Sequence, residues 1–285
     1  MLFIKPGFTS SFSHLQRFSV VDGLSQQNIT ALVKGNQGNI WIGTDDGVNI
    51  YDGYNFHQLP GPKAKFSDYR IAKLYQQNND DMWISLFEGG LYKYTPHEQR
   101  YQLIYESSEP KKSYDTIIDI HQDYNGNMWF ASSHSLFKFS VKEQRLIEQI
   151  NISHLFELEH RIFDINIHNG NVYLATKIGL FVYQPNVQKL NKLPLPEVSK
   201  DHSTNELFTT EILNQLLYIG TDNGVLSIPL SAIDNYLEQA TNKLDYQLEI
   251  ADLNVWHLLT QDNQLYVSSH NGLYQYSVNK QQLKK

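Results

Sequence analysis

The sequence contains no cysteine, which excludes disulfide bonds and thiolate metal sites. This absence assigns no compartment, because domains without cysteine occur both in an oxidising periplasm and in a reducing cytosol. Basic residues are in deficit: 23 Lys and Arg stand against 30 Asp and Glu, which gives a formal net charge of -7. Such a chain offers no basic field to phosphates or anionic lipids, so nucleic acid is not an expected partner.

Long apolar runs are also missing. The first residues, Met1 to Gly7, lack the apolar core of a secretory signal, and no stretch is long and apolar enough to cross a membrane. We therefore expect a soluble chain, with any targeting or anchoring segment belonging to a longer parent protein. Catalytic serine elbows, zinc-binding histidine pairs and phosphate-binding glycine loops are absent, and the 11 histidines show no metal-ligand spacing. The sequence predicts no catalytic residue, no metal site and no cofactor.

Aromatic residues are abundant, and six of them mark an internal repeat. Each lies in a short apolar segment such as Ile40-Trp41-Ile42, and the six are Trp41, Trp83, Trp129, Tyr173, Tyr218 and Tyr266. Successive members are 42, 46, 44, 45 and 48 residues apart, which is the length of a four-stranded propeller blade. The flanking residues alternate or form short apolar runs between Asn/Gly turns, which favours strands over helical hairpins.

Glycine follows the aromatic by six residues in five of the six copies: Gly47, Gly89, Gly179, Gly224 and Gly272, with Ser135 in the third. This spacing predicts a tight turn with positive φ between the second and third strands of each unit. The fold class is therefore all-β, a β-propeller of four-stranded antiparallel blades with six repeats, either six-bladed or part of a seven-bladed ring. The recurring tryptophans are expected to pack between blades rather than to bind a ligand.

The whole chain, residues 1–285, is interpreted as a single β-propeller domain with a flexible N-terminal segment over residues 1–14. A strand over Leu15 to Val20 stands where the outer strand of a preceding blade belongs, so it is expected to complete the last blade, with Leu283 in a rival outer strand. Ser231 and Asp234 fit a capping box that opens a short helix within residues 231–239.

Ligands of propellers generally bind at the mouth of the central channel, where the loops before the first strand and after the second strand meet. Aromatic and polar residues there would suit a sugar or another polar small molecule, although turn residues are polar in any solvated loop. Asp119 and Asp164 lie on first strands and either pair across the channel, as glycosidases require, or are isolated acids. The candidate ligand-binding residues are Tyr69, Arg70, Glu88, Asp115, His134, Arg161, Lys177, Glu206, Asp222, Trp256 and His270.

The first copy, Asp22-Gly23-Leu24-Ser25 followed by Gly38-Asn39-Ile40-Trp41-Ile42-Gly43-Thr44, resembles the two-component regulator propeller repeat. The third copy keeps the Gly-Asn-x-Trp turn, and the last three replace Trp by Tyr. The resemblance implies a periplasmic, non-enzymatic sensor domain of a bacterial signal-transduction protein, which binds a small molecule or an oligosaccharide such as a glycan fragment.

The same resemblance implies a histidine kinase or a diguanylate cyclase downstream in the same parent chain, a membrane link through that parent only, and a homodimer as a further arrangement. Two other functions stay open. One is a propeller lyase or glycoside hydrolase, because the Asn-Gly-Asn-x-Trp turn is distantly similar to turns of sialidases and of antibiotic-cleaving lyases. The other is a protein-interaction scaffold of the WD-repeat kind, although the Trp-Asp signature is absent.

Overall fold

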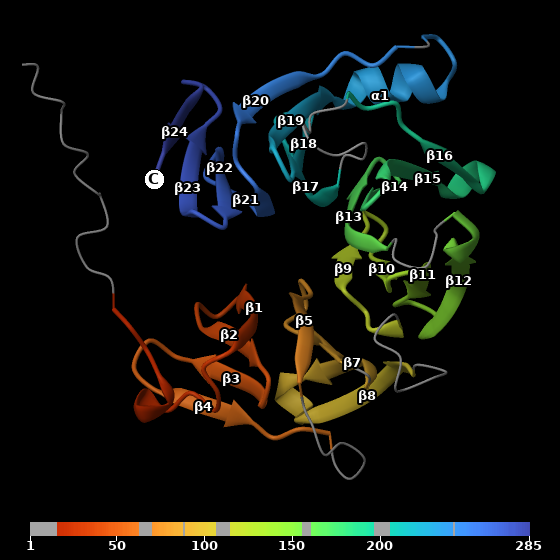
Figure 1. Cartoon of the computed structure of the whole chain (residues 1–285). Helices are drawn as coiled ribbons and strands as arrows, with labels where there is room; N and C mark the ends of the chain where they lie inside the picture. Colours follow the sequence, from red (N-terminus) through yellow and green to blue (C-terminus); the bar gives the residue numbers. More distant parts are fainter. Residues whose placement is uncertain are drawn as a thin grey trace, which may run out of the picture.

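The computed structural model describes residues 16–62, 70–87, 89–106, 115–155, 161–196, 206–241 and 243–285. Within these residues the chain forms six four-stranded antiparallel sheets that follow one another around a common centre (Figure 1). This arrangement confirms the predicted six-bladed β-propeller. The predicted flexible segment 1–14 and the candidate site residues Tyr69 and Glu88 lie outside the described residues.

We number the blades 1 to 6 along the chain, and each runs from an inner to an outer strand. Blades 1 to 3 comprise β1 (Ile29–Lys34), β2 (Ile40–Thr44), β3 (Gly47–Tyr51) and β4 (Phe56–Leu59); β5 (Ile71–Gln76), β6 (Met82–Leu86), β7 (Gly90–Thr95) and β8 (Arg100–Tyr105); and β9 (Asp119–Gln122), β10 (Met128–Ala131), β11 (Ser135–Ser140) and β12 (Arg145–Asn151).

Blades 4 to 6 repeat the same order of strands. They comprise β13 (Ile162–His168), β14 (Asn171–Thr176), β15 (Gly179–Gln184) and β16 (Lys189–Lys192); β17 (Leu207–Leu213), β18 (Leu216–Thr221), β19 (Gly224–Pro229) and β20 (Gln247–Ala251); and β21 (Val255–Gln261), β22 (Gln264–Ser269), β23 (Gly272–Ser277) and β24 (Gln282–Lys284). The helix α1 (Leu230–Leu237) precedes β20.

The hydrophobic core lies between neighbouring blades. Trp41 of blade 1, for example, packs with Leu74 and Ile84 of blade 2 in one buried cluster. The indole rings of Trp83 and Trp129 are fully buried, and their N–H groups donate to Gln77 Oε1 at 2.9 Å and to Asp123 Oδ2 at 3.2 Å. These contacts confirm that the recurring tryptophans are packing residues, and those of blades 2 and 3 satisfy their single polar atom within their own blade.

The turn between the second and third strands has the predicted left-handed residue, with one change of position. Gly47 has φ +85°, and in blade 2 the equivalent residue is Gly90, with φ +86°. The prediction had placed this residue at Gly89, but the turn of blade 2 is one residue longer, with β6 ending at Leu86 and β7 beginning at Gly90. A Cβ on Gly90 would lie 2.3 Å from the Tyr105 carbonyl oxygen, so only glycine fits this site.

One prediction about the chain ends and one about the helix are corrected. Residues 16–19 form no strand; instead Phe18 packs on Tyr51 and Phe56 of blade 1, with ring centroids 5.1 and 5.3 Å apart. The outer strand of the last blade is β24, which contains Leu283. The predicted helix exists, but it begins at Leu230 with Pro229 as its N-cap and no side-chain cap, so the Ser231 capping box is wrong.

Candidate functional site at the mouth of the channel

The inner strands β1, β5, β9, β13, β17 and β21 surround the centre of the ring (Figure 1). Alternate residues of a strand point to opposite faces, so two residues on one side of each inner strand point toward the next blade, beside the channel. The residues at the first of these positions are Ala31, Lys73, Asp119, Asp164, Thr209 and His257, and those at the second are Val33, Tyr75, His121, Asn166, Glu211 and Leu259.

Side chains at these two positions accept hydrogen bonds from the backbone of the next blade. Asp119 Oδ2 accepts from the N–H of Ile165 at 2.9 Å, and Asp164 Oδ2 accepts from the N–H of Thr210 at 2.7 Å. The inner edge of a sheet carries N–H groups without a strand partner, and these acceptors satisfy them. Three further bonds follow the same rule: Thr209 with Leu258, Glu211 with Thr260, and the Tyr75 hydroxyl with the N–H of Gln122.

The channel acids are therefore links between blades. The sequence offered two interpretations, a catalytic pair across the channel or isolated acids, and neither describes them. Asp119 and Asp164 lie on neighbouring blades, and each carboxylate accepts a hydrogen bond from the backbone of the blade that follows.

A buried ion pair stands at the centre of this network. Lys73 Nζ lies 2.6 Å from Asp119 Oδ1, and His121 Nε2 lies 3.2 Å from Asp119 Oδ2. Burial alone would raise the pKa of Asp119, but the charges of Lys73 and His121 outweigh it and hold that pKa below its ordinary value. For Asp164, burial and the neighbouring Asp119 carboxylate both raise the pKa well above its ordinary value.

Three aromatic side chains form an arc at the start of consecutive inner strands. Phe163, Phe208 and Trp256 each stand at a shift in register, where β13, β17 and β21 carry one residue more than their partner strands. Such a β-bulge turns a side chain away from the regular alternation. The rings of Phe163 and Phe208 meet edge to face with centroids 5.3 Å apart, and Trp256 is 59% exposed. We call these three residues the aromatic arc.

Charged side chains lie next to the arc at the junction of blades 4 and 5. The Arg161 guanidinium lies 4.9 Å from the centre of the Phe163 ring, and Lys177 Nζ lies 3.6 Å from Glu206 Oε1. The N–H of Lys177 donates to the Arg161 carbonyl at 3.3 Å, which joins the two predicted loops. The structure thus brings Arg161, Lys177 and Glu206 together at the junction of blades 4 and 5.

Arg70 belongs to a second group, at the junction of blades 1 and 2. Its Nε donates to Asp45 Oδ1 at 3.0 Å, and its guanidinium lies 4.2 Å from the centre of the Phe87 ring. One edge of this guanidinium is therefore bound by Asp45 and one of its faces is covered by Phe87, while the side chain is still 53% exposed.

The other candidates are distributed over separate blades. Asp115 is half-buried before β9, His134 and Asp222 are half-buried in turns of blades 3 and 5, and His270 is exposed in the turn of blade 6. Their contact with a ligand stays a prediction. Phe163 and Phe208 are functional candidates that the sequence pattern did not indicate, although both align with Trp256 when the inner strands are superposed on their register.

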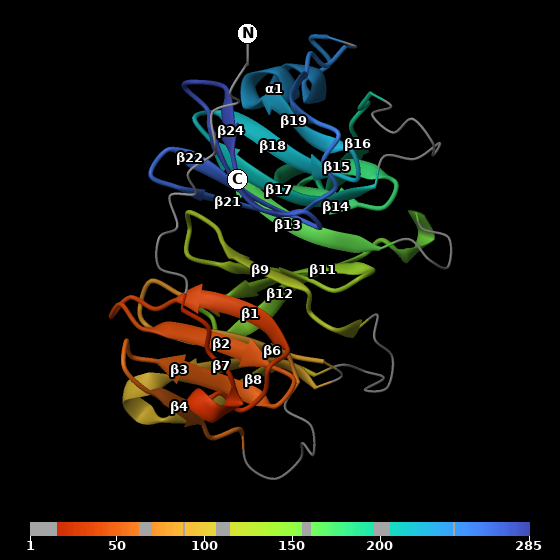
Figure 2. The same cartoon turned by 60° about the vertical axis from the view of Figure 1, so that its left-hand side comes forward.

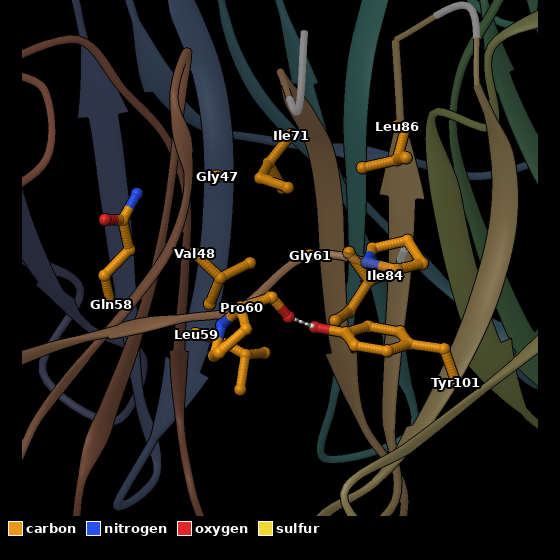
Figure 3. A pocket seen from close by; sticks show the side chains of 11 residues that line it. Gly47, Val48, Gln58, Leu59, Pro60, Gly61, Ile71, Ile84, Leu86 and Tyr101 are labelled. Carbon is orange, nitrogen blue, oxygen red and sulfur yellow. Dashed lines mark hydrogen bonds between the residues drawn. The ribbon is translucent and has the colours of Figure 1, made fainter. Parts of the chain in front are cut away.

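A separate pocket of about 290 Å³ lies between blades 1 and 2 (Figure 3). Val48, Leu59 and Ile84 line it, none of the described residues that line it is charged, and the Tyr101 hydroxyl donates to the Pro60 carbonyl at 2.7 Å. A ligand rich in hydroxyl groups would lose its hydrogen bonds to water there without replacement. A larger cavity of about 550 Å³ reaches the channel, where Lys73 and His257 contribute to its walls. The channel is therefore the better place for a polar ligand.

Among the residues that the structure describes, no group of three His, Asp or Glu side chains could hold a metal ion. No helix in the same part of the chain is long and apolar enough to span a membrane.

The fold and the site define a β-propeller with a hydrogen-bonded polar channel and an aromatic mouth. Residues 23–46 match the family model described as two component regulator propeller, which confirms the resemblance seen in the first repeat. No curated protein matches the chain.

Solved structures show the same fold. The extracellular domain of the putative hybrid two component system BT3049 from B. thetaiotaomicron has a TM-score of 0.72 at 15% identity over 93% of this chain. The extracellular domain of the putative one component system BT4673 from the same organism has a TM-score of 0.70 at 20% identity over 92%. This chain spans about a third of their length, 36% and 33% respectively.

An enzyme shares the architecture. A catalytically inactive variant of virginiamycin B lyase from Staphylococcus aureus with Quinupristin has a TM-score of 0.67 at 10% identity, over 92% of this chain and 85% of that chain. At these identities the likenesses show the fold, and the function has to be argued from the site.

Proposed function

We propose that this chain is the sensing propeller of a bacterial signal-transduction protein and binds a small polar ligand, such as a glycan fragment, without converting it. The aromatic arc carries the proposal. Sugar rings present C–H faces that pack on aromatic rings, while their hydroxyl groups need charged or polar partners at the edge. Phe163, Phe208 and Trp256 offer the faces, and Arg161 and Glu206 offer the partners.

The arrangement favours binding over turnover. General acid–base catalysis needs carboxyl groups within reach of the substrate and free to exchange protons. Asp119, Asp164 and Glu211 instead accept hydrogen bonds from the next blade, and these bonds hold the ring together. A ligand at the mouth would meet aromatic and rim residues before it met these acids.

The family match and the extracellular relatives support a location outside the cytoplasmic membrane, in the periplasm. In this proposal the propeller belongs to a membrane-anchored parent protein, and ligand binding is relayed to a downstream histidine kinase or diguanylate cyclase. A homodimer of such parents would let a change at the mouth alter the geometry of the paired chains.

Trp256 provides a direct test. It is exposed, whereas Trp41, Trp83 and Trp129 are each at most 4% exposed, so a ligand on the arc should shift the emission of this one tryptophan. We would titrate the protein with oligosaccharides of defined composition, from neutral glucans to fragments containing uronic acids. Binding at the arc predicts that Phe208→Ala weakens affinity by about tenfold or more, the effect of losing one stacking ring.

Tyr124→Ala supplies the control, because Tyr124 is an aromatic that is even more accessible, 79% exposed, and lies away from the arc in the turn between the first and second strands of blade 3. The affinity of the Tyr124→Ala variant for the oligosaccharide should equal that of the unchanged protein. The ligand recovered after incubation should also be intact by mass spectrometry. Equal affinity for Phe208→Ala would remove the site from the arc, and a cleaved or isomerised sugar would favour the lyase or hydrolase function instead.

A further inference from the structure

We propose that the cavity of about 550 Å³ at the channel receives the N-acetyl group of an amino sugar while the sugar ring packs on the aromatic arc. This rests on the proposed function and narrows its ligand to an N-acetylated hexosamine or a short chain of them. An N-acetyl group combines one hydrogen-bond acceptor, the carbonyl oxygen, with an apolar methyl group. The cavity offers partners for both.

The position at the start of each inner strand gives the mouth two unlike halves. In blades 4 to 6 this position holds the aromatic arc. In blades 1 and 2 it holds Thr30 and Ala72, at the register shifts of β1 and β5, and in blade 3 Ile118 stands directly before Asp119 in the same way. These three side chains are smaller than aromatic rings and all of them line the cavity, so space for a ligand group remains on this half of the mouth.

The walls of the cavity are mostly apolar, with Ala31, Leu74, Ile118 and Leu259 among the residues that form them. A sugar ring with a hydroxyl group on nearly every carbon would lose hydrogen bonds to water against such walls without replacement. A methyl group gains by leaving water for the same walls. The cavity is therefore better suited to an apolar substituent of a sugar than to the sugar ring itself.

Three polar side chains reach the same cavity: Lys73, Thr30 and His257. Lys73 Nζ contacts Asp119 Oδ1 at 2.6 Å, and within the described part of the chain this leaves two of its three N–H groups for an acceptor on a ligand. The Thr30 hydroxyl is buried and has no hydrogen-bond partner among the described residues. A buried polar atom without a partner at the wall of a cavity indicates a polar atom of a ligand beside it.

The charges near the cavity favour a neutral acceptor over a carboxylate. The ammonium of Lys73 is already balanced by the carboxylate of Asp119. Burial and that same carboxylate raise the pKa of Asp164 well above its ordinary value, so these surroundings resist a further negative charge. An amide carbonyl accepts a hydrogen bond from Lys73 without adding charge, whereas the carboxylate of a uronic acid would add one.

The cavity and the arc are close enough for one sugar to use both. Trp256 and His257 are consecutive residues, which places the end of the arc beside a wall of the cavity. In an N-acetylated hexosamine the amide nitrogen is bonded directly to a ring carbon. A ring that packs on Trp256 would therefore project its acetyl group sideways, toward Lys73 and Ala72.

Four trimers of sugars test the assignment, with the emission of Trp256 as the readout. Trimers of N-acetylglucosamine, glucose and glucosamine with the same linkage differ in one substituent on each ring, and a trimer of glucuronic acid supplies the carboxylate. We expect the N-acetylglucosamine trimer to bind about tenfold or more tightly than each of the other three.

Two variants fill the cavity and test whether it holds the acetyl group. Ala72→Leu should reduce the ratio of the affinities for the N-acetylglucosamine and glucose trimers to about one, because the larger side chain occupies the space of the acetyl group. Thr30→Leu fills the same cavity from blade 1 and replaces Ala72→Leu if circular dichroism shows that the latter is not folded.

Ala240→Leu is the matched control, since it adds the same atoms at an exposed position. Ala240 follows helix α1, which stands at the edge of the molecule in both views (Figures 1 and 2). This variant should keep the affinity ratio of the unchanged protein.

Equal or tighter binding of the glucose or glucosamine trimer would overturn this proposal and leave the proposed function standing, because a sugar would still bind on the arc. Tighter binding of the glucuronic acid trimer would overturn it in favour of a carboxylate. An acetyl preference that persists in a folded, cavity-filling variant would move the acetyl group out of the cavity and overturn the site. No change in Trp256 emission with any of the four trimers would contradict the proposed function itself.

Discussion

Removal of the Asp119 carboxylate tests whether the channel network holds the ring together. The side chain is 1% exposed, and its two oxygens contact Lys73 Nζ at 2.6 Å and the N–H of Ile165 at 2.9 Å. Asp119→Ala leaves a buried ammonium and a backbone N–H of the next blade without partners. Loss of one member of a buried ion pair costs about 3–5 kcal/mol.

Two features of the structure lower this figure. The Lys73 side chain is 28% exposed and regains some water, and Asp164, whose pKa is raised partly by Asp119, ionises more easily once that charge is gone. We therefore expect Asp119→Ala to lower the free energy of unfolding by about 3 kcal/mol. Asp119→Asn keeps an acceptor for Ile165 and should cost about 1–2 kcal/mol less than Asp119→Ala, the penalty of one unsatisfied buried N–H.

Urea unfolding, followed by the fluorescence of the buried tryptophans, measures both values. Asp245→Ala is the control, since Asp245 forms an ion pair with Lys243 that is fully on the surface, and it should change stability by less than about 0.5 kcal/mol. Equal losses for Asp119→Ala and Asp119→Asn would refute the role of the Ile165 bond. A loss no larger than that of the control would refute the network as a whole.

Two further predictions concern proton uptake and backbone strain. Because the pKa of Asp164 is raised in the folded protein, its contribution to stability is complete at acidic pH and is lost as the pH rises through that pKa. Asp164→Asn should remove this pH dependence of the free energy of unfolding, which amounts to at most about 1.4 kcal/mol per pH unit. Urea titrations between about pH 4.5 and 7.5 would measure it, and parallel stability curves for the two proteins would contradict it. Gly90 and Gly38 share a φ of +86°, but of the two only Gly90 would place a Cβ against a backbone oxygen. Gly90→Ala should therefore lower the melting midpoint well below that of Gly38→Ala, and equal shifts in melting midpoint would contradict the steric argument.

The blade architecture follows from local signals that recur. An aromatic every 42 to 48 residues, with a glycine six residues later, marks the second strand and the turn after it, and the structure has both. The predictions that failed depend on distant contacts. The segment around Phe18 has the composition of a strand, but its rings pack on Tyr51 and Phe56, and no sequence pattern states which blade an outer strand joins.

The site was predicted less completely, because a β-bulge has no simple sequence signature. Strict alternation along β13 and β17 assigns Phe163 and Phe208 to a face between blades, and the register shift at the start of each strand turns them instead toward the mouth. Trp256 was selected for its chemistry, whereas its two neighbours on the arc were passed over as ordinary strand residues.

The inner strands divide the channel into two zones, and this division limits where a ligand can bind. Deeper residues such as Asp119 and Asp164 already have partners in the next blade, so a ligand that engaged them would weaken the junctions that form its own site. The aromatic side chains of the bulge residues at the mouth do not hold a neighbouring blade in this way. In blade 6 the corresponding positions hold His257 and Leu259, which line the cavity at the channel together with residues of blades 1 and 2.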